Sequence, residues 1–377
     1  MNKSSFEKIV SNDKALDESD IVYLLNSKRK EINQLMALAN HQRESDIITY
    51  SKNIFIPVTE ICRNECGYCI FKKTSNSPNT IILKDKKEII SEVKASEKYG
   101  CKEALLTFGE QADLDKTVLN TLKKKGYSSM VEYIYDICEN ILSKTELLPH
   151  TNGGVFEYED MKALKEINVS MGMMIENSSP RLMKTIAHEK SPGKDPKLRL
   201  KVLTDAGKLK IPYTTGILIG IGETKEEIAK SLIKIKKIQD KYGHIQELII
   251  QNFKSKNGTP MEKHPEPSLL DMIKTVSVAK LLFKDLSIQV PPNLNYHTNQ
   301  TFLLCGADDW GGVSPITRDY VNPEAKWPQL STLKKLTNEC GYELKERLAI
   351  YDKYINSNYL NHDLLNKTLE IKNGLEQ

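Results

Sequence analysis

Three cysteines lie within one short stretch of the chain. Cys62, Cys66 and Cys69 follow directly on an apolar, strand-like run over residues 53–58. Thiolates are soft ligands that suit iron–sulfur clusters and zinc. A [4Fe–4S] cluster normally takes four protein thiolates, so three on one loop would leave one iron open. The spacing therefore predicts a cluster with an open coordination position, which is where metal sites perform chemistry.

A structural zinc site is the alternative interpretation of this loop. Such a site needs a fourth ligand nearby, preferably from a second pair of cysteines or histidines. The next cysteine is Cys101 and the first downstream histidine is His150, so the sequence offers no such pair. We prefer the cluster, and a non-enzymatic metal-binding module stays open as a different class of function.

The composition limits the function without naming it. The 377 residues are 39% hydrophobic and 28% charged, which suits a folded protein with a large core. The net charge is only +4 and the lysines are dispersed, so we expect no nucleic-acid partner. We expect no membrane span either, because no apolar run approaches the roughly 20 residues that one requires. Seven irregularly spaced cysteines and the absence of a signal-peptide pattern favour the cytoplasm.

Strand-like and helix-like segments alternate from Asn53 onward, and repeated βα units imply parallel strands with right-handed crossovers. We therefore predict an α/β fold, a (βα) barrel of the TIM-barrel type, over residues 51–330. Residues 1–50 and 331–377 are expected to be helical extensions, with Ser19 as the N-cap of an early helix that packs on the barrel base. The tail after Asn356 is expected to fray. Expected strands cover residues 104–108, 147–149, 169–175, 213–221, 248–253 and 288–290, and expected helices cover residues 87–99, 161–167, 198–206, 228–242 and 269–282.

Polar residues recur where the expected strands end. The active site of such a barrel lies at the carboxyl ends of its strands, so these side chains should share one rim. This recurrence favours a functional role over ordinary solvated loop residues. The positions are the cysteine loop, Glu110, Asn152, Glu176, Glu223 and Asn252.

The cysteine loop, with Tyr68 before its last cysteine, resembles the radical S-adenosylmethionine superfamily. In that family three thiolates hold a [4Fe–4S] cluster, and S-adenosylmethionine binds the fourth iron through its amino and carboxylate groups. The resemblance implies that Cys62, Cys66 and Cys69 are the cluster ligands and that S-adenosylmethionine is the second cofactor. It also implies an external low-potential electron donor.

Two acids and an arginine resemble residues that contact S-adenosylmethionine in this superfamily. Residues 108–110 are similar to its Gly-Gly-Glu motif, in which the acid binds the methionine ammonium, although Phe108 replaces the first glycine. The resemblance implies that role for Glu110. Glu176 resembles the polar residue that contacts the ribose or the methionine part. Arg199 resembles the helical arginine that pairs with the methionine carboxylate, a task that suits a guanidinium.

The adenine end of the cofactor has its own set of resemblances. Residues 216–223 are similar to the fifth-strand motif of the superfamily, in which small residues let the backbone approach adenine. The resemblance implies this role for Gly216 and Gly220. Tyr68 is implied to contact adenine as well, although packing beneath the loop is its alternative role.

Residues 306–315 are dense in glycines and carboxylates and read as a tight loop. Asp308 or Asp309 could cap a backbone amide there. Two acids close to Trp310 and Trp327, the two tryptophans of the chain, also suit a polar aromatic substrate. The stretch resembles the family of first, ring-closing subunits of 7,8-didemethyl-8-hydroxy-5-deazariboflavin synthases. Supporting likenesses lie in residues 188–196 and 211–216, and the sister subunit carries Asn where Asp308 stands.

This resemblance implies a carbon–nitrogen lyase of deazaflavin (coenzyme F420) biosynthesis. The implied substrate is 5-amino-5-(4-hydroxybenzyl)-6-(D-ribitylimino)-5,6-dihydrouracil, whose central ring would close with loss of ammonia. A sister radical enzyme would supply this adduct and is the implied functional partner. Candidate catalytic residues are Asp308, Asp309 and Tyr213, with Asn252 and His297 as further candidates by position. Another radical enzyme of this barrel group, such as the sister subunit or a biotin-synthase-like or maturase-like protein, stays open.

Overall fold

Eight parallel strands form a closed ring at the centre of the protein. The computed structural model describes residues 6, 9 and 15–375, and its sheet closes because β1 pairs with both β2 and β8. The predicted (βα) barrel is therefore confirmed. The strands are β1 (Ile47–Thr59), β2 (Glu103–Phe108), β3 (Leu148–Asn152), β4 (Ser170–Gly172), β5 (Tyr213–Ile219), β6 (Ile245–Asn252), β7 (Ser287–Gln289) and β8 (Asp309–Val313).

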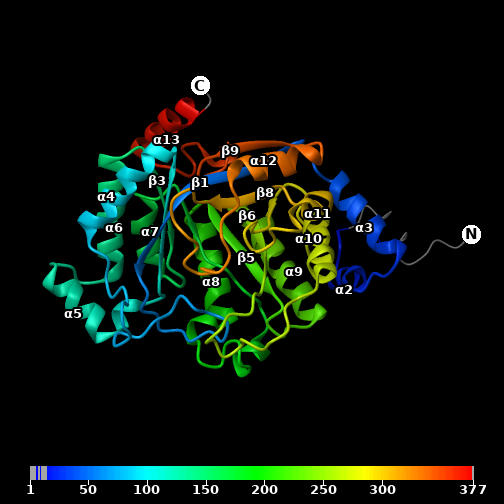
Figure 1. Ribbon diagram of the computed structural model, residues 1–377, viewed down its shortest axis with the longest axis horizontal. Coiled ribbons are helices and arrows are strands. Elements are labelled where there is room, and N and C mark those ends of the chain that lie inside the picture. Colours follow the sequence, from blue (N-terminus) through cyan, green and yellow to red (C-terminus); the bar gives the residue numbers. More distant parts are fainter. Residues whose placement is uncertain (1–5, 7–8, 10–14, 376–377) are drawn as a thin grey trace, which may run out of the picture.

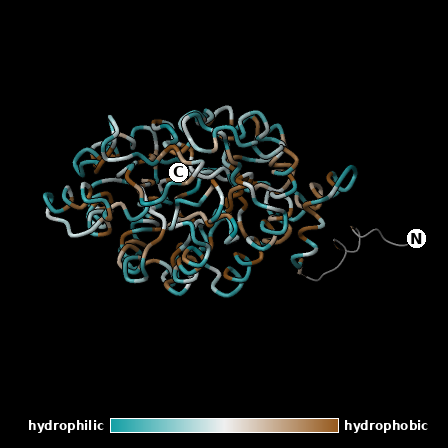
Figure 2. Tube along the Cα trace, turned by 90° about the horizontal axis from the view of Figure 1, so that it is seen from below, coloured by the Kyte–Doolittle hydropathy of each residue, from teal (hydrophilic) through white to brown (hydrophobic). Residues whose placement is uncertain are grey.

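Helices surround the strands (Figure 1). Hydrophilic and hydrophobic segments alternate along the peripheral helices in Figure 2, as expected of helices that bury one face against a sheet. Within the part of the chain that the structure describes, each helix is too short or too polar to cross a lipid bilayer. The helices are α2 (Glu18–Leu25), α3 (Lys30–His41), α4 (Lys86–Ser96), α5 (Lys116–Lys124), α6 (Met130–Lys144), α7 (Tyr158–Lys165), α8 (Pro196–Lys208), α9 (Lys225–Tyr242), α10 (Leu269–Leu282), α11 (Asn299–Leu304), α12 (Leu330–Glu339) and α13 (His362–Leu375).

Strand β1 shows how the barrel separates its core from its lumen. Successive side chains of a strand point to opposite faces of the sheet. Ile54, Ile56 and Val58 are buried in the hydrophobic core, whereas Asn53 and Phe55 line a cavity inside the ring. The outer layer of apolar contacts therefore supports the barrel, and the inner face is free to carry polar groups.

The sequence predicted a helical C-terminal extension, but the extension also contains a strand. Helix α12 is followed by a strand, β9 (Glu343–Arg347), which pairs in parallel with residues 47–51 of β1. β2 pairs with the same edge of β1, but only over residues 53–59, so the beginning of that edge is left free for β9. A partner so distant in sequence leaves no local signal. The tail after Asn356 was expected to fray, but its residues His362–Leu375 form helix α13 (Figure 1).

Residues 309–313 form strand β8 and not the loop that their composition suggested. Glycines weaken a strand, and two of them lie in this segment. Pairing with β1 on one side and β7 on the other overrides that preference. The segment thereby completes the barrel, and its first residue, Asp309, lies level with Thr49 near the amino end of β1.

The N-terminal helices pack against the helical layer and not against the barrel base. α2 contacts α9 and α10, and α3 contacts α10 and α11. The N-cap of α2 is Asp17 and not Ser19, because Asp17 and Asp20 form a reciprocal capping box. Strand β1 already begins at Ile47, inside the segment that was expected to be a helical extension.

An arginine from β9 neutralises two carboxylates inside the barrel. Arg347 Nε lies 2.6 Å from Asp309 Oδ2, and its Nη2 lies 2.8 Å from Glu247 Oε2. All three side chains are at least nine-tenths buried. The guanidinium also lies 4.2 Å above the ring of Tyr351. The C-terminal extension therefore supplies the positive charge that lets these acids stay inside.

Replacement of Arg347 should destabilise the fold strongly. Arg347→Met leaves Asp309 and Glu247 buried without a counter-charge, which typically costs about 3–5 kcal/mol. Chemical denaturation should show this loss, whereas Lys162→Met, which removes an exposed ion pair with Glu159, should change stability by less than about 1 kcal/mol. Equal stability of the two variants would contradict the assigned role of Arg347.

Candidate functional site

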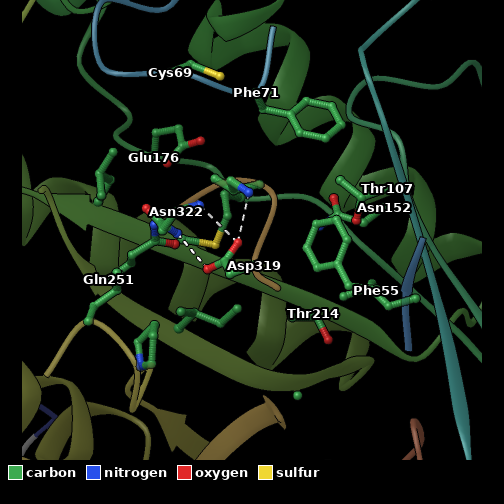
Figure 3. A pocket seen from close by; sticks show the side chains of 18 of the residues that line it. Phe55, Cys69, Phe71, Thr107, Asn152, Glu176, Thr214, Gln251, Asp319 and Asn322 are labelled. Carbon is green, nitrogen blue, oxygen red and sulfur yellow. Dashed lines mark hydrogen bonds between the residues drawn. The ribbon is translucent and has the colours of Figure 1, made fainter. Parts of the chain in front are cut away.

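A cavity of about 340 Å³ occupies the inside of the barrel. Its lining comes from the inner faces of the strands and from the loops at their carboxyl ends, as the barrel rule predicts. Figure 3 shows Cys69 and Phe71 at one end of the view and Thr214 at the other, with Asp319 and Asn322 between them. The cysteine loop and the polar residues of the strand interiors therefore share one space.

All three cysteines of the loop line this cavity as free thiols. Burial raises the pKa of Cys62 to about 11, and it raises the pKa of Cys66 as well. Among the described residues, no three His, Cys, Asp or Glu side chains are already drawn together as a metal-ligand set. The donor chemistry nevertheless fits an iron–sulfur cluster, since three soft donors face one cavity and lose their protons when a metal binds.

Backbone contacts fix the course of the cysteine loop. The Gly67 N–H donates to the Ala187 carbonyl at 3.0 Å, and the Glu65 N–H donates to the Lys190 carbonyl at 3.1 Å. A Cβ atom at Gly67 would lie 2.2 Å from the Ile186 oxygen, so only glycine allows this approach. The segment 186–190 therefore holds the loop in place through backbone contacts.

Glu110 lies in a tight cradle beside the cysteine loop. Its carboxylate accepts hydrogen bonds from Arg63 Nε at 2.9 Å, Arg199 Nη1 at 3.0 Å and the Val155 N–H at 3.1 Å. Burial opposes ionisation, but the cations, Arg199 first, lower the pKa of Glu110 below its ordinary value. Cβ atoms at Gly193 and Gly154 would lie 1.5 Å and 2.4 Å from its oxygens, so this cradle requires glycine at both positions. Glu110 is thus held as a buried anion at the cavity wall.

A second ion pair lies next to it. Lys194 Nζ is 2.6 Å from Glu176 Oε1. Burial opposes ionisation of Glu176, but the positive charges of Lys194 and Arg199 outweigh it and lower the pKa of this carboxyl. Glu176 has a φ of +61°, a conformation that is uncommon for a residue with a side chain and that occurs often at functional sites. Arg199, which is 3% exposed, also donates to the Met174 and Gly193 carbonyls. The structure thus brings Glu110, Glu176 and Arg199 together at the cysteine end.

Tyr68 also joins this group. Its ring is buried at the cavity wall, and its hydroxyl lies 3.0 Å from His188 Nε2. Burial lowers the pKa of His188 to about 3, so the imidazole is neutral. Sequence reasoning did not single out His188 or Lys194 as site residues. Their only signal was the likeness in residues 188–196, which did not say which side chains face the cavity.

Gly216 and Gly220 do not themselves line the cavity. Gly216 lets β5 approach β6 closely, since a Cβ there would lie 2.3 Å from the Ile249 oxygen. Gly220 has a φ of +97°, which favours glycine, and its N–H donates to Glu223 Oε1 at 2.7 Å. Leu218, between the two glycines, is the cavity-lining residue of this motif.

The three candidate catalytic residues lie away from the cysteines. Tyr213 is the first residue of β5 and does not line the cavity, whereas its neighbour Thr214 does. Asp308 is 2.9 Å from Lys280 and 3.4 Å from Arg43, beyond the amino end of β8. Asp309 is enclosed by Arg347 as described above. Because both carboxylates are paired with cations of the fold, these contacts favour structural roles for Asp308 and Asp309 over catalytic ones.

The two further candidates differ from each other. Asn252, at the end of β6, lines the cavity, and its Oδ1 accepts a hydrogen bond from Asn295 Nδ2 at 2.9 Å. His297 is exposed, meets the ring of Tyr296 edge to face and lies outside the cavity lining. Of the two, only Asn252 is therefore placed to meet a bound molecule.

Carboxylates at the amino ends of the strands line the deepest part of the cavity. Glu103 accepts a hydrogen bond from the Ser51 hydroxyl, and Glu247 accepts one from Thr214. Burial raises the pKa of Glu103 to about 7, and the negative charges of Glu247 and Asp309 add to this effect. A single guanidinium, Arg347, thus faces three acids, and Glu103 exchanges its proton near pH 7, where about half of the molecules carry it.

Comparisons with known proteins agree with this geometry. Residues 56–235 match the family model of the radical SAM superfamily. The chain is 60% identical over 334 residues to a 7,8-didemethyl-8-hydroxy-5-deazariboflavin synthase from Methanobrevibacter smithii, covering 88% of this chain and 98% of that one. It is 53% identical to the synthase of the same name from Methanocaldococcus jannaschii, covering 94% of this chain and 98% of that one.

Solved structures resemble the chain in fold. The crystal structure of HydG, a maturase of the [FeFe]-hydrogenase, superimposes with a TM-score of 0.72 at 17% identity, covering 91% of this chain and 75% of that one. Methylornithine synthase (PylB) gives a TM-score of 0.69 at 18% identity, covering 90% of this chain and 97% of that one. At such identities, the likeness shows the fold alone.

Glu103→Gln should make stability less dependent on pH. A carboxyl whose pKa rises from 4.5 to about 7 on folding contributes stability below the lower value and loses it as pH rises through the higher one. Each pKa unit is worth about 1.4 kcal/mol, so at pH 8 the variant should gain on the order of 3 kcal/mol. Denaturant unfolding of the cluster-free protein should show this gain shrinking toward pH 5, and a gain that does not vary with pH would contradict the assignment.

Proposed function

The chain belongs to the family of 7,8-didemethyl-8-hydroxy-5-deazariboflavin synthases, and from this premise we propose that it is the ring-closing radical enzyme of that synthesis. The substrate would be the adduct of a tyrosine-derived hydroxybenzyl group and a ribitylimino-dihydrouracil, which would lose ammonia as a carbon–nitrogen lyase reaction requires. A sister radical enzyme would supply the adduct, and a separate low-potential protein would supply electrons. Membership of the radical S-adenosylmethionine superfamily implies a [4Fe–4S] cluster and S-adenosylmethionine as cofactors.

The observation that carries this proposal is the collection of charged groups around the cysteine end of the cavity. Glu110, Glu176, Lys194 and Arg199 present two anions and two cations beside the three thiols. A zwitterion with an ammonium and a carboxylate, such as the methionine part of S-adenosylmethionine, matches such a set. Beyond the cysteine end, the cavity is lined by amides and aromatic rings, together with acids that already accept hydrogen bonds, which suits a neutral substrate.

Each residue of the cysteine end has a proposed task. Cys62, Cys66 and Cys69 would hold the cluster, which with S-adenosylmethionine supplies a radical that removes a hydrogen atom from the substrate. Glu110 would accept hydrogen bonds from the methionine ammonium, and Arg199 would pair with the methionine carboxylate. The remaining cofactor contacts are proposed for Tyr68, Glu176 and the backbone around Gly216 and Gly220.

The barrel itself contributes orientation and exclusion of water. Glu110 and Arg199 are already paired and buried, so their orientation is set before the cofactor enters. Enclosure by the strands and loops keeps a reactive carbon radical away from solvent. The chemistry would be that of the cofactor, and the protein would determine which hydrogen is within reach.

Product formation tests the proposed reaction directly. Anaerobically reconstituted protein, incubated with the synthetic adduct, S-adenosylmethionine and a strong reductant, should form the fluorescent deazaflavin and release ammonia. Omission of S-adenosylmethionine should abolish both signals. A protein that cleaves S-adenosylmethionine but leaves the adduct unchanged would exclude this substrate and favour another reaction of the same superfamily.

Cys66→Ala should abolish retention of the cluster and leave the barrel folded. A cluster with two thiolates in place of three loses a ligand, whereas the strands do not depend on this loop side chain. Iron content and visible absorbance after anaerobic reconstitution report the first property, and far-ultraviolet circular dichroism reports the second. The matched control is Cys340→Ala, at the end of α12 and outside the cavity, which should keep a full complement of iron. Full iron content in Cys66→Ala would contradict the ligand assignment.

A further inference from the structure

Five buried polar atoms without a hydrogen-bond partner belong to residues that line the cavity. Buried polar groups in folded proteins are nearly always paired, so the unpaired ones along a single cavity are available to hydrogen-bond a bound molecule. The set contains two acceptors, two donors and one hydroxyl that can serve as either. The atoms are Asn53 Oδ1, Thr107 Oγ1, Asn293 Oδ1, Trp310 Nε1 and Trp327 Nε1.

Asp319, whose own oxygens are fully hydrogen-bonded, fixes the orientation of Asn293. Asp319 accepts hydrogen bonds from Asn293 Nδ2 at 3.0 Å and from Asn322 Nδ2 at 2.9 Å (Figure 3). Two backbone N–H groups, those of Val321 and Asn322, occupy its other oxygen. The amide nitrogen of Asn293 is therefore committed, and its oxygen is left as a preset acceptor.

The two glycines of β8 make room for further amides. A Cβ at Gly311 would lie 2.0 Å from Gln289 Nε2, and a Cβ at Gly312 would lie 2.1 Å from Asn53 Nδ2. Both amides line the cavity and lie against the strand where any other residue would place a side chain. The sequence feature that had suggested a loop thus gives the barrel wall its amide lining.

The charges around this lining are already compensated. Arg347 is paired with Asp309 and Glu247, and Asp319 is filled by four N–H donors. The five unpaired atoms belong to uncharged side chains, so they suit a neutral ligand that carries several hydrogen-bond donors and acceptors. The rings of Phe55 and Trp327 lie at the cavity wall, where a heterocycle can pack against them.

We propose that Asn53, Thr107, Asn293, Trp310 and Trp327 form an amide–indole subsite that binds the neutral, polyhydroxylated pyrimidine part of the substrate. This inference rests on the proposed function and deepens it, because it names the residues that determine which heterocycle the enzyme accepts. These residues bind and orient the substrate, and the hydrogen abstraction takes place at the cysteine end.

The two tryptophans of the chain both line this subsite, so its occupancy can be read from intrinsic fluorescence. The probe is 6-(D-ribitylamino)uracil, titrated into the cluster-free protein, with 4-hydroxybenzyl alcohol as the phenolic counterpart. The ribityl-pyrimidine should change the tryptophan emission saturably. The phenol should give a weaker response that does not displace it.

Two variants test the assigned contacts. Trp327→Phe keeps an aromatic ring but removes the indole N–H, and Asn293→Ala removes the preset acceptor. Each should weaken binding of the probe about tenfold, as the loss of one buried hydrogen bond predicts. Asn366→Ala, at an exposed position of α13, is the matched control and should bind like the unmodified protein. Should Asn293→Ala fail to fold, as its thermal unfolding would show, Trp327→Phe still decides the question.

Unchanged affinity in Trp327→Phe, or a stronger response to the phenol than to the ribityl-pyrimidine, would overturn the subsite. Such a failure is distinguishable from a failure of the proposed function. If the protein makes the deazaflavin but both variants bind the probe as tightly as the unmodified protein, the proposed reaction stands and the subsite is wrong. If the variants weaken probe binding but the protein makes no deazaflavin, the subsite stands and the proposed reaction is wrong.

Discussion

Closure of the sheet at β1 is the constraint on which the rest of the structure depends. Pairing of this one strand with β2, β8 and β9 turns an open sheet into a ring and sets the level at which each neighbour begins. The cysteine loop leaves the carboxyl end of the same strand, so closure also brings the thiols to the mouth of the cavity. Without that closure, Glu110 on the loop after β2 and Arg199 on α8 would have no reason to meet beside them.

Charge is distributed along the cavity in a way that follows from this geometry. Loops at the carboxyl ends of the strands supply paired ions around the cysteines, whereas the strands and the segments after β7 and β8 supply amides and indole rings. At the amino ends, three acids share one guanidinium, which comes from the C-terminal strand. A zwitterionic cofactor would therefore bind among charged groups and a neutral substrate among uncharged ones, so that each meets groups of matching polarity.

The sequence was sufficient for the barrel and for the gathering of Glu110, Glu176 and Arg199, because parallel strands bring their carboxyl ends to a common rim. It was insufficient where a partner lies far away in the chain. Asp309 looked like a substrate ligand because its partner, Arg347, lies on a strand whose pairing with β1 has no local signature. The unpaired oxygen of Asn293 likewise depends on Asp319 and could not be foreseen from composition.

In the proposed reaction, one iron of a cluster at the cysteine loop is left for S-adenosylmethionine to bind. Electron paramagnetic resonance of the reduced, oxygen-free protein, with and without S-adenosylmethionine, tests it most directly. We expect S-adenosylmethionine to change the signal of the [4Fe–4S] cluster. A cluster signal that stays the same at saturating S-adenosylmethionine, with every iron ligated by side chains, would contradict it.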